Sequence, residues 1–264
     1  MNFSLNPKDW ARNSVIDDEG RPKENFQKAI EKAIDIQRPF VIKKVRELRA
    51  KHPDETPEQF IERLERRYMT AVTAGGAAVG ATAFVPGVGT VASLGFSAAA
   101  TIGFMEASAV FAQAVAEVHG IQLKDPERAK ALVMAVMLGE ESSAMLAMLG
   151  AQATGRGGGT QDYWGKLVGT SGQAGISGQV MASIRRRFFT RFVTRQGAGF
   201  IGRTVPFGIG AVIGGAGNRI MGKSIIKAAR EAFGPAPETI PGELVPSQDE
   251  IEAAAKSEDS ADKE

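Results

Sequence analysis

Residues 217–224, GNRIMGKS, fit the G-x-x-x-x-G-K-S pattern of a P-loop. In a P-loop the backbone amides cradle phosphates, a lysine reaches the terminal phosphates, and a serine hydroxyl binds magnesium. Such a loop follows a buried strand, and a later acidic residue holds the metal. Here the upstream stretch PFGIGAVIGGAG is too rich in glycine for a buried strand, and only one helical stretch and an acidic tail follow. Lys223 is therefore a weak candidate for nucleotide binding, and the surroundings favour a helix.

Small residues recur at helical spacing in two segments. The members are Gly95, Ala99, Gly103 and Ala107 in the first segment and Gly210, Gly214, Asn218 and Gly222 in the second. Glycine inside a helix costs about 0.8–1 kcal/mol relative to alanine, so repeated glycines indicate close contact with a partner helix. The second segment predicts a helix that starts near 204–206, ends at Gly234 and packs on the first segment's hairpin.

Two carboxylates, Glu106 and Glu117, lie eleven positions apart, close to one face of a helix that also carries Gln113. A pair of carboxylates could serve as general acid and base. A solvated or hydrogen-bonded polar stripe explains the same spacing. The chain has no cysteine and two histidines, and His119 precedes Gly120 at an expected helix end, so no metal site is predicted.

The stretch SIRRRFFTRFVTRQ, residues 183–196, combines aromatic and basic residues at helical spacing. Ile184, Phe188 and Phe192 align on one face. The arginines beside them are Arg185, Arg186, Arg187, Arg191 and Arg195. Two interpretations remain open: a helix at an anionic membrane surface with its rings in the headgroup region, or a core-facing apolar stripe with a solvated basic face. Nucleic-acid binding is not expected, because no reader fold surrounds the motif.

The longest uncharged run extends from Tyr68 to Met105, and FVPGVGT interrupts it. This pattern predicts a helical hairpin with arms of about 20 residues, the length that crosses a bilayer core. Val, Leu, Ile and Phe supply only ten of its 38 residues, whereas Ala and Gly supply seventeen, which makes stable spanning marginal. The sequence leaves open whether the hairpin is buried in the protein or inserts in lipid.

Local signals predict where several helices begin and break. Pro39 indicates a kink or break between two amphipathic stretches. Thr56 and Gln59 form a capping box, and Asp125 before a proline is suited to cap another helix.

Charge and composition divide the chain into a basic body and an acidic end. Residues 235–264 hold nine acids and two lysines, a net charge of −7, so that 1–234 carry +9 of the total of +2. We expect 1–22 to be an extension, 153–179 a flexible glycine-rich loop, and 235–264 a disordered acidic tail with a short helix around 251–256. No secretory signal is seen at the start, which favours the cytoplasm.

The stretch AVAEVHGIQLKDPERAKALVMAVMLG, preceded by the VPGVGT hairpin and followed by VPFGIGAVIGGAGNRIMGKSIIKAAREAF, resembles the bacterial EcsC-like family. That family is named for a protein associated with an ABC transporter. The resemblance covers roughly residues 25–234. It implies a helical, cytoplasmic or membrane-associated protein without an established catalytic site, and the domain is taken as 23–234.

These observations together predict an all-α fold: one helical domain with a Gly/Ala-rich hairpin and a Gly-rich C-terminal helix. We expect a non-catalytic protein without cofactor or metal that docks at the inner face of the cell membrane. Its expected partner is an anionic membrane surface or a membrane protein such as a transporter, with self-association also open. The alternative is a hydrolase or nucleotide-binding enzyme that uses Glu106, Glu117 or the Lys223 region.

Overall fold

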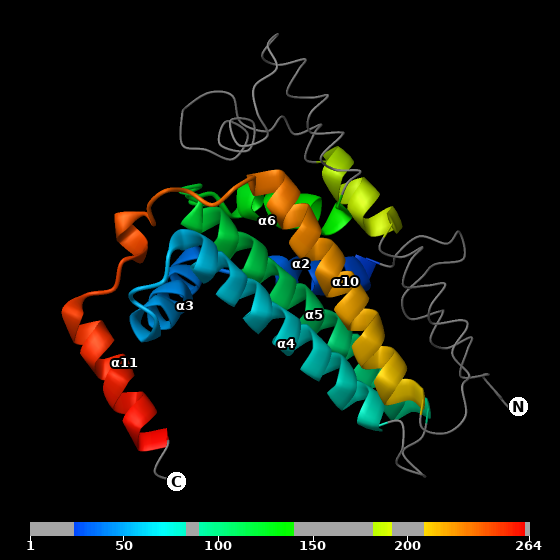
Figure 1. The fold of residues 1–264 in the computed structure, drawn as a ribbon. Helices are drawn as coiled ribbons and strands as arrows, with labels where there is room; N and C mark the ends of the chain where they lie inside the picture. The colour runs from blue at the N-terminus through cyan, green and yellow to red at the C-terminus, as the bar shows by residue number, and fades with distance from the viewer. Residues whose placement is uncertain (1–23, 83–89, 140–181, 192–208, 262–264) are drawn as a thin grey trace, which may run out of the picture.

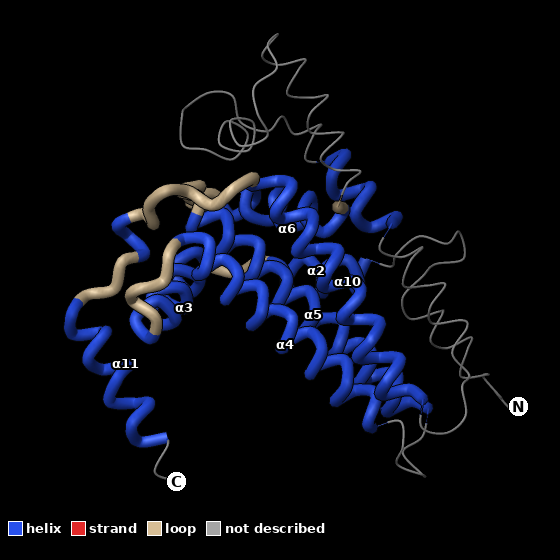
Figure 2. The backbone as a smooth tube through the Cα atoms, in the orientation of Figure 1, coloured by secondary structure: helices blue, strands red, loops and turns tan. Residues whose placement is uncertain are grey.

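The computed structural model describes residues 24–82, 90–139, 182–191 and 209–261, and this part of the chain is helical with no strand (Figures 1 and 2). The predicted all-α fold is therefore confirmed. The expected extension at 1–22 and glycine-rich loop at 153–179 lie outside the described residues, as does Arg195.

Helices of very different length make up the fold. Their bounds are α2 Glu24–Ile34, α3 Arg38–Lys51, α4 Pro57–Thr82, α5 Thr90–Val118, α6 Pro126–Leu138, α10 Ile209–Phe233, the short 3-10 helix η1 Gly242–Leu244 and α11 Gln248–Ala261. Residues 182–191 form a further helical segment between α6 and α10 in the chain.

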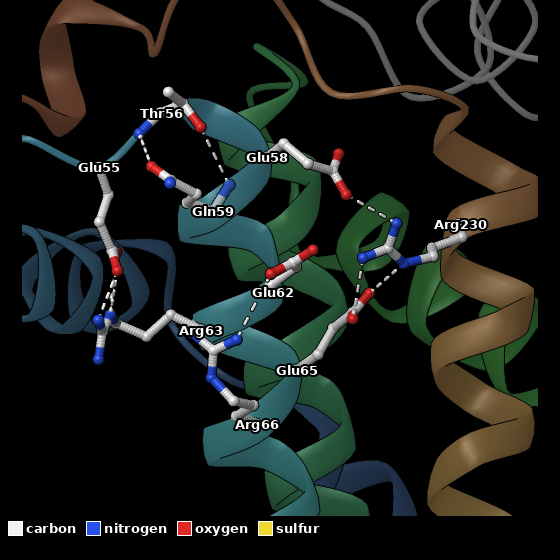
Figure 3. Close-up of polar contacts among 9 residues, drawn as sticks. All are labelled: Glu55, Thr56, Glu58, Gln59, Glu62, Arg63, Glu65, Arg66 and Arg230. Atoms are coloured by element: carbon white, nitrogen blue, oxygen red, sulfur yellow. Dashed lines mark hydrogen bonds and ion pairs between the residues drawn. The ribbon is translucent and has the colours of Figure 1, made fainter.

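The predicted helix ends agree with the structure. The Thr56 amide donates to Gln59 Oε1 at 2.9 Å and the Gln59 amide donates to Thr56 Oγ1 at 3.3 Å, which is the reciprocal geometry of a capping box (Figure 3). The Asp125 carboxylate accepts from the amide of Glu127 at 2.9 Å and caps α6. His119 Nδ1 donates to the Val115 carbonyl at 2.8 Å at the end of α5, and Gly120 follows with a φ of 76°.

The α4–α5 pair is the predicted hairpin, and α5 is its central element. Helices α2, α3, α4, α6 and α10 all pack against α5, and every residue of 111–118 is buried. A helical stretch covered on all sides has no polar face, which explains why the sequence of 111–118 shows so little amphipathic pattern. In the described residues no helix has both the length and the apolar character required to cross a membrane.

Helix α10 lies along α4 as the outer layer of the bundle (Figure 1). Arg230 on α10 donates from Nε to Glu65 at 2.6 Å and from Nη1 to Glu58 at 2.9 Å, so one guanidinium holds two acids of α4 (Figure 3). The α10 helix ends at Phe233, and Gly234 adopts a φ of 76°, as the sequence predicted for its stop.

The expectation that 235–264 is disordered is corrected for 235–261. Leu244 in η1 is 1% exposed, and α11 packs along α3. Composition suggested a solvated tail, but its acids meet arginines of α3: Glu250 lies 2.5 Å from Arg46 and Glu243 lies 2.7 Å from Arg38. The short helix expected around 251–256 is present as part of the longer α11.

Candidate functional site

The helical segment 182–191 presents its apolar side to the protein. Ile184, Phe188 and Phe189 are 0%, 2% and 4% exposed, and the two rings pack edge to face with centroids 5.3 Å apart. The expectation that these rings enter the headgroup region is therefore wrong for Ile184 and Phe188, because burial in the core already covers them. Phe192 lies outside the described residues. The second interpretation, a core-facing stripe under a basic face, is the one observed.

The basic face of this segment is a run of three consecutive exposed arginines, Arg185, Arg186 and Arg187. Arg185 forms an ion pair with Glu31 of α2 at 2.7 Å, which fixes the segment on the bundle. Within the described part of the chain, Arg186 and Arg187 are paired with no acid. Arg191 is half-buried and has a partner of its own. Of the four predicted arginines that the structure describes, three therefore face solvent. We call Arg185–Arg187 the arginine face.

A second exposed basic surface lies on α10. Arg219 and Lys223 are exposed and lie one helical turn apart. The side chain of Ile220 beside them is 71% exposed, more than that of any other large apolar residue in the described part of the chain. From the sequence, Lys223 was a weak candidate for nucleotide binding, and neither Arg219 nor Ile220 was singled out. The signal was available, because basic residues at i and i+4 with an apolar residue between them mark one helix face.

The P-loop match does not form a loop. Residues 217–224 lie inside α10, more than one turn from either end. Amides within a helix donate to carbonyls four residues back and cannot cradle a phosphate. The packing interpretation of this stretch is therefore supported by its secondary structure, and Lys223 is an exposed side chain on a helix surface.

The C-terminal members of the predicted packing ridge, Asn218 and Gly222, lie against α4. Asn218 Nδ2 donates to the Val72 carbonyl of α4 at 3.0 Å, and Gly222 is buried so close to α4 that a Cβ atom there would lie 2.9 Å from Met69 Sδ and 3.1 Å from Val72 Cγ2. Gly103 differs from this prediction: it is exposed, and among the described residues nothing lies within 4 Å of the position that its Cβ would take. Gly95, Gly210 and Gly214 are helical residues, but their surroundings lie outside what the structure describes.

The two carboxylates expected on one face have different environments. Glu106 is exposed, whereas Glu117 is 3% exposed and bound to Arg38 by two hydrogen bonds of 2.6 and 2.8 Å. Glu117 Oε1 also accepts from the Leu123 amide at 3.1 Å. The structure thus places Glu117 in a structural ion pair, separate from Glu106. Among the described residues no group of His, Cys, Asp or Glu side chains is arranged to hold a metal.

Hydrogen bonds to Glu117 and then to Glu243 raise the pKa of the Arg38 guanidinium, and the Arg38 hydrogen bond lowers the pKa of Glu243. One arginine of α3 therefore joins α5 and the C-terminal segment through two acids. Comparison of the chain with models of protein families, with curated proteins and with solved structures gave no match. The resemblance to the EcsC-like family remains a prediction.

Proposed function

We propose that this protein is a non-catalytic, peripheral membrane protein that docks on anionic membrane surfaces through its arginine face. The observation that supports the proposal is the exposure of three consecutive arginines on a segment whose apolar side is buried. Because Phe188 and the Arg185–Glu31 pair anchor the segment, its backbone is already ordered before binding, and only the arginine side chains lose freedom on docking.

The strength of such docking follows from electrostatics. Each lysine or arginine near an anionic leaflet contributes about 1 kcal/mol, and the contribution is screened over a Debye length. Two or three arginines therefore give weak, reversible, salt-sensitive attachment. The basic body of the chain adds a long-range attraction of the same sign. Docking at the inner face of the cell membrane, where anionic lipid faces the cytoplasm, is part of this proposal.

The α10 surface is a secondary contact in the proposal. Arg219 and Lys223 could meet phosphates while the exposed Ile220 side chain enters the headgroup region. The alternative partner is a membrane protein with an acidic surface, which would bind to the arginine face through ion pairs.

Co-sedimentation with vesicles tests the proposal. The full chain is mixed at low and high salt with vesicles of phosphatidylglycerol and phosphatidylcholine, and with phosphatidylcholine alone. We expect salt-sensitive binding only to the anionic vesicles. Replacing Arg186 and Arg187 with glutamine removes about 2 kcal/mol and lowers partitioning about 30-fold.

The matched control is Lys43→Gln with Arg66→Gln, which removes the same charge from exposed positions on α3 and α4. This control is expected to bind like the natural protein. Equal loss in both double variants would mean that net charge and not the arginine face governs binding. Failure of the natural protein to bind anionic vesicles at low salt would refute the proposal. The double variant Arg219→Gln with Lys223→Gln measures how much the α10 surface contributes to vesicle binding.

A further inference from the structure

A groove of about 420 Å³ opens between α3, α4 and α5. Most of its lining is apolar. Its apolar members include Phe40 of α3, Tyr68 and Ala71 of α4, and Phe111 of α5. The volume is within the range of about 300–1,000 Å³ in which small-molecule sites fall.

The floor of the groove offers no hydrogen-bonding group to a ligand. Among the residues that line the floor, Tyr68 carries a hydroxyl group. That hydroxyl donates to Ser108 Oγ at 2.9 Å. Ser108 in turn donates to the Phe104 carbonyl at 2.7 Å. Burial raises the pKa of Tyr68, so the hydroxyl stays protonated. A ligand in the groove must therefore present hydrocarbon to it, because any buried polar group of the ligand would lose its hydrogen bonds.

The charged residues of the lining carry an excess of positive charge. Lys44, Lys51 and Arg67 line the groove against a single acid, Glu47, and the Lys44 ammonium lies 2.8 Å from that acid. Phe40, which also lines the groove, is 48% exposed. A hydrocarbon chain bound in the groove would cover its ring. The combination of an apolar floor and cationic side chains is complementary to an amphiphile with one anionic end.

The volume limits the size of the occupant. At roughly 30 Å³ for each heavy atom, the share that a water molecule has in the liquid, the groove holds about fourteen heavy atoms. That is one hydrocarbon chain and not two. A helix of about 10–12 Å diameter could place only a few side chains in the same space.

We propose that the groove between α3, α4 and α5 binds a single medium-chain fatty acid of about twelve carbons, with the chain on the apolar floor and the carboxylate beside Arg67. The inference does not rest on membrane docking, because the groove is formed by other elements than the arginine face. The two proposals therefore fail separately: groove variants are expected to keep vesicle binding, and the Arg186→Gln with Arg187→Gln variant is expected to keep fatty-acid binding.

The probe is radiolabelled dodecanoic acid, a medium-chain carboxylic acid whose size matches the groove, titrated into the full chain and displaced by unlabelled dodecanoic acid or by dodecanol. We expect saturable binding and stronger displacement by the acid than by the alcohol. Ala71→Phe fills the groove from an exposed position and is expected to weaken binding at least about tenfold, as for the loss of one well-filled apolar contact. Ala74→Phe, exposed on the same helix and outside the lining, is the control.

Arg67→Gln tests the head group without changing the apolar floor. It is expected to lower the affinity for dodecanoic acid about two- to fivefold, as for a partly exposed ion pair, and to leave the affinity for dodecanol unchanged. Arg66→Gln, outside the lining, is its control. Unsaturable binding, or equal binding by Ala71→Phe and the natural protein, would overturn the proposal. So would equal affinity of acid and alcohol, or a dimer that dissociates in Ala71→Phe without any probe binding, since a second copy would then fill the groove.

Discussion

Arg38 at the start of α3 and Glu117 near the end of α5 meet in a two-point ion pair across 79 positions of the chain. The side chain of Glu117 is 3% exposed and that of Arg38 is 16% exposed. Arg38 Nη2 also donates to Glu243 Oε2 at 2.7 Å. The pair thus neutralises a charge in the centre of the bundle and connects it to the segment before α11.

Arg38→Met should destabilise the protein strongly. Removal of one partner of a buried pair leaves an uncompensated charge and costs about 3–5 kcal/mol. Arg46→Met on the same helix breaks an exposed pair with Glu250 and should cost at most about 1 kcal/mol. Chemical denaturation measures both free energies of unfolding. Similar small losses in the two variants would show that Glu117 is not held as an ionised, dehydrated carboxylate.

Docking of α11 should depend on pH through Glu250. The hydrogen bond from Arg46, followed by that from the Ser247 amide, lowers the pKa of Glu250 to about 2. Because the folded pKa lies below the ordinary value of about 4.3, the stabilisation is complete above that value and is lost as pH falls through about 2. Carboxyl NMR of Glu250 should give the low midpoint, and Arg46→Gln should raise it. A midpoint near 4.3 in the natural protein would contradict the observed contact.

Two glycines should respond to alanine in opposite directions. At Gly222 the new methyl group meets Val72, which is buried, β-branched and stiff, so overpacking of about 1–3 kcal/mol exceeds the gain in helix propensity of about 1 kcal/mol. At Gly103 nothing lies near the methyl group, and alanine should stabilise by up to about 1 kcal/mol. Thermal denaturation of both variants gives the signs. Stabilisation by Gly222→Ala would mean that α4 and α10 can separate at no cost.

Replacing Gln113 with an apolar residue should stabilise the protein. Its side chain is 1% exposed, and neither its amide nitrogen nor its oxygen has a hydrogen-bond partner among the described residues. A buried polar group without partners costs about 1–3 kcal/mol, so Gln113→Met, of similar shape, should raise the free energy of unfolding by an amount in that range. Ser108→Ala is a contrast, because Ser108 is hydrogen-bonded to Tyr68 and its removal should destabilise. A loss of stability in Gln113→Met would point to a polar partner that binds there.

Features that depend on neighbouring residues could be predicted from the sequence. The caps at Thr56 and Asp125 involve contacts two or three positions away, and the break at Pro39 follows from proline itself. The start of α11 belongs to the same class: Ser247 and Glu250 form a capping box, with the Ser247 amide 2.7 Å from Glu250 Oε2, although the acidic composition around it suggested disorder.

Features that depend on distant partners could not be predicted. The spacing of Glu106 and Glu117 is compatible with one face, but only the position of α3 makes Glu117 buried and leaves Glu106 exposed. Gly103 and Gly222 occur in equivalent patterns, yet only Gly222 has a helix against it. The helical spacing of Ile184 and Phe188 is the same whether these side chains face lipid or the protein core. The hydrophobic pattern alone therefore could not distinguish the two interpretations.

The pairing of α4 with α10 has a consequence for synthesis of the chain. Asn218 of α10 bonds to Val72 of α4 across 146 positions of the chain. After the ribosome has synthesised Val72, it must therefore add those residues before Asn218 exists. At about 5–20 residues per second this takes roughly 7–30 s. During that time Val72 and Met69 form an uncovered apolar strip on the nascent chain. The helix α10 is thus made long after α4, and this side of the first hairpin arm stays uncovered until α10 has been synthesised.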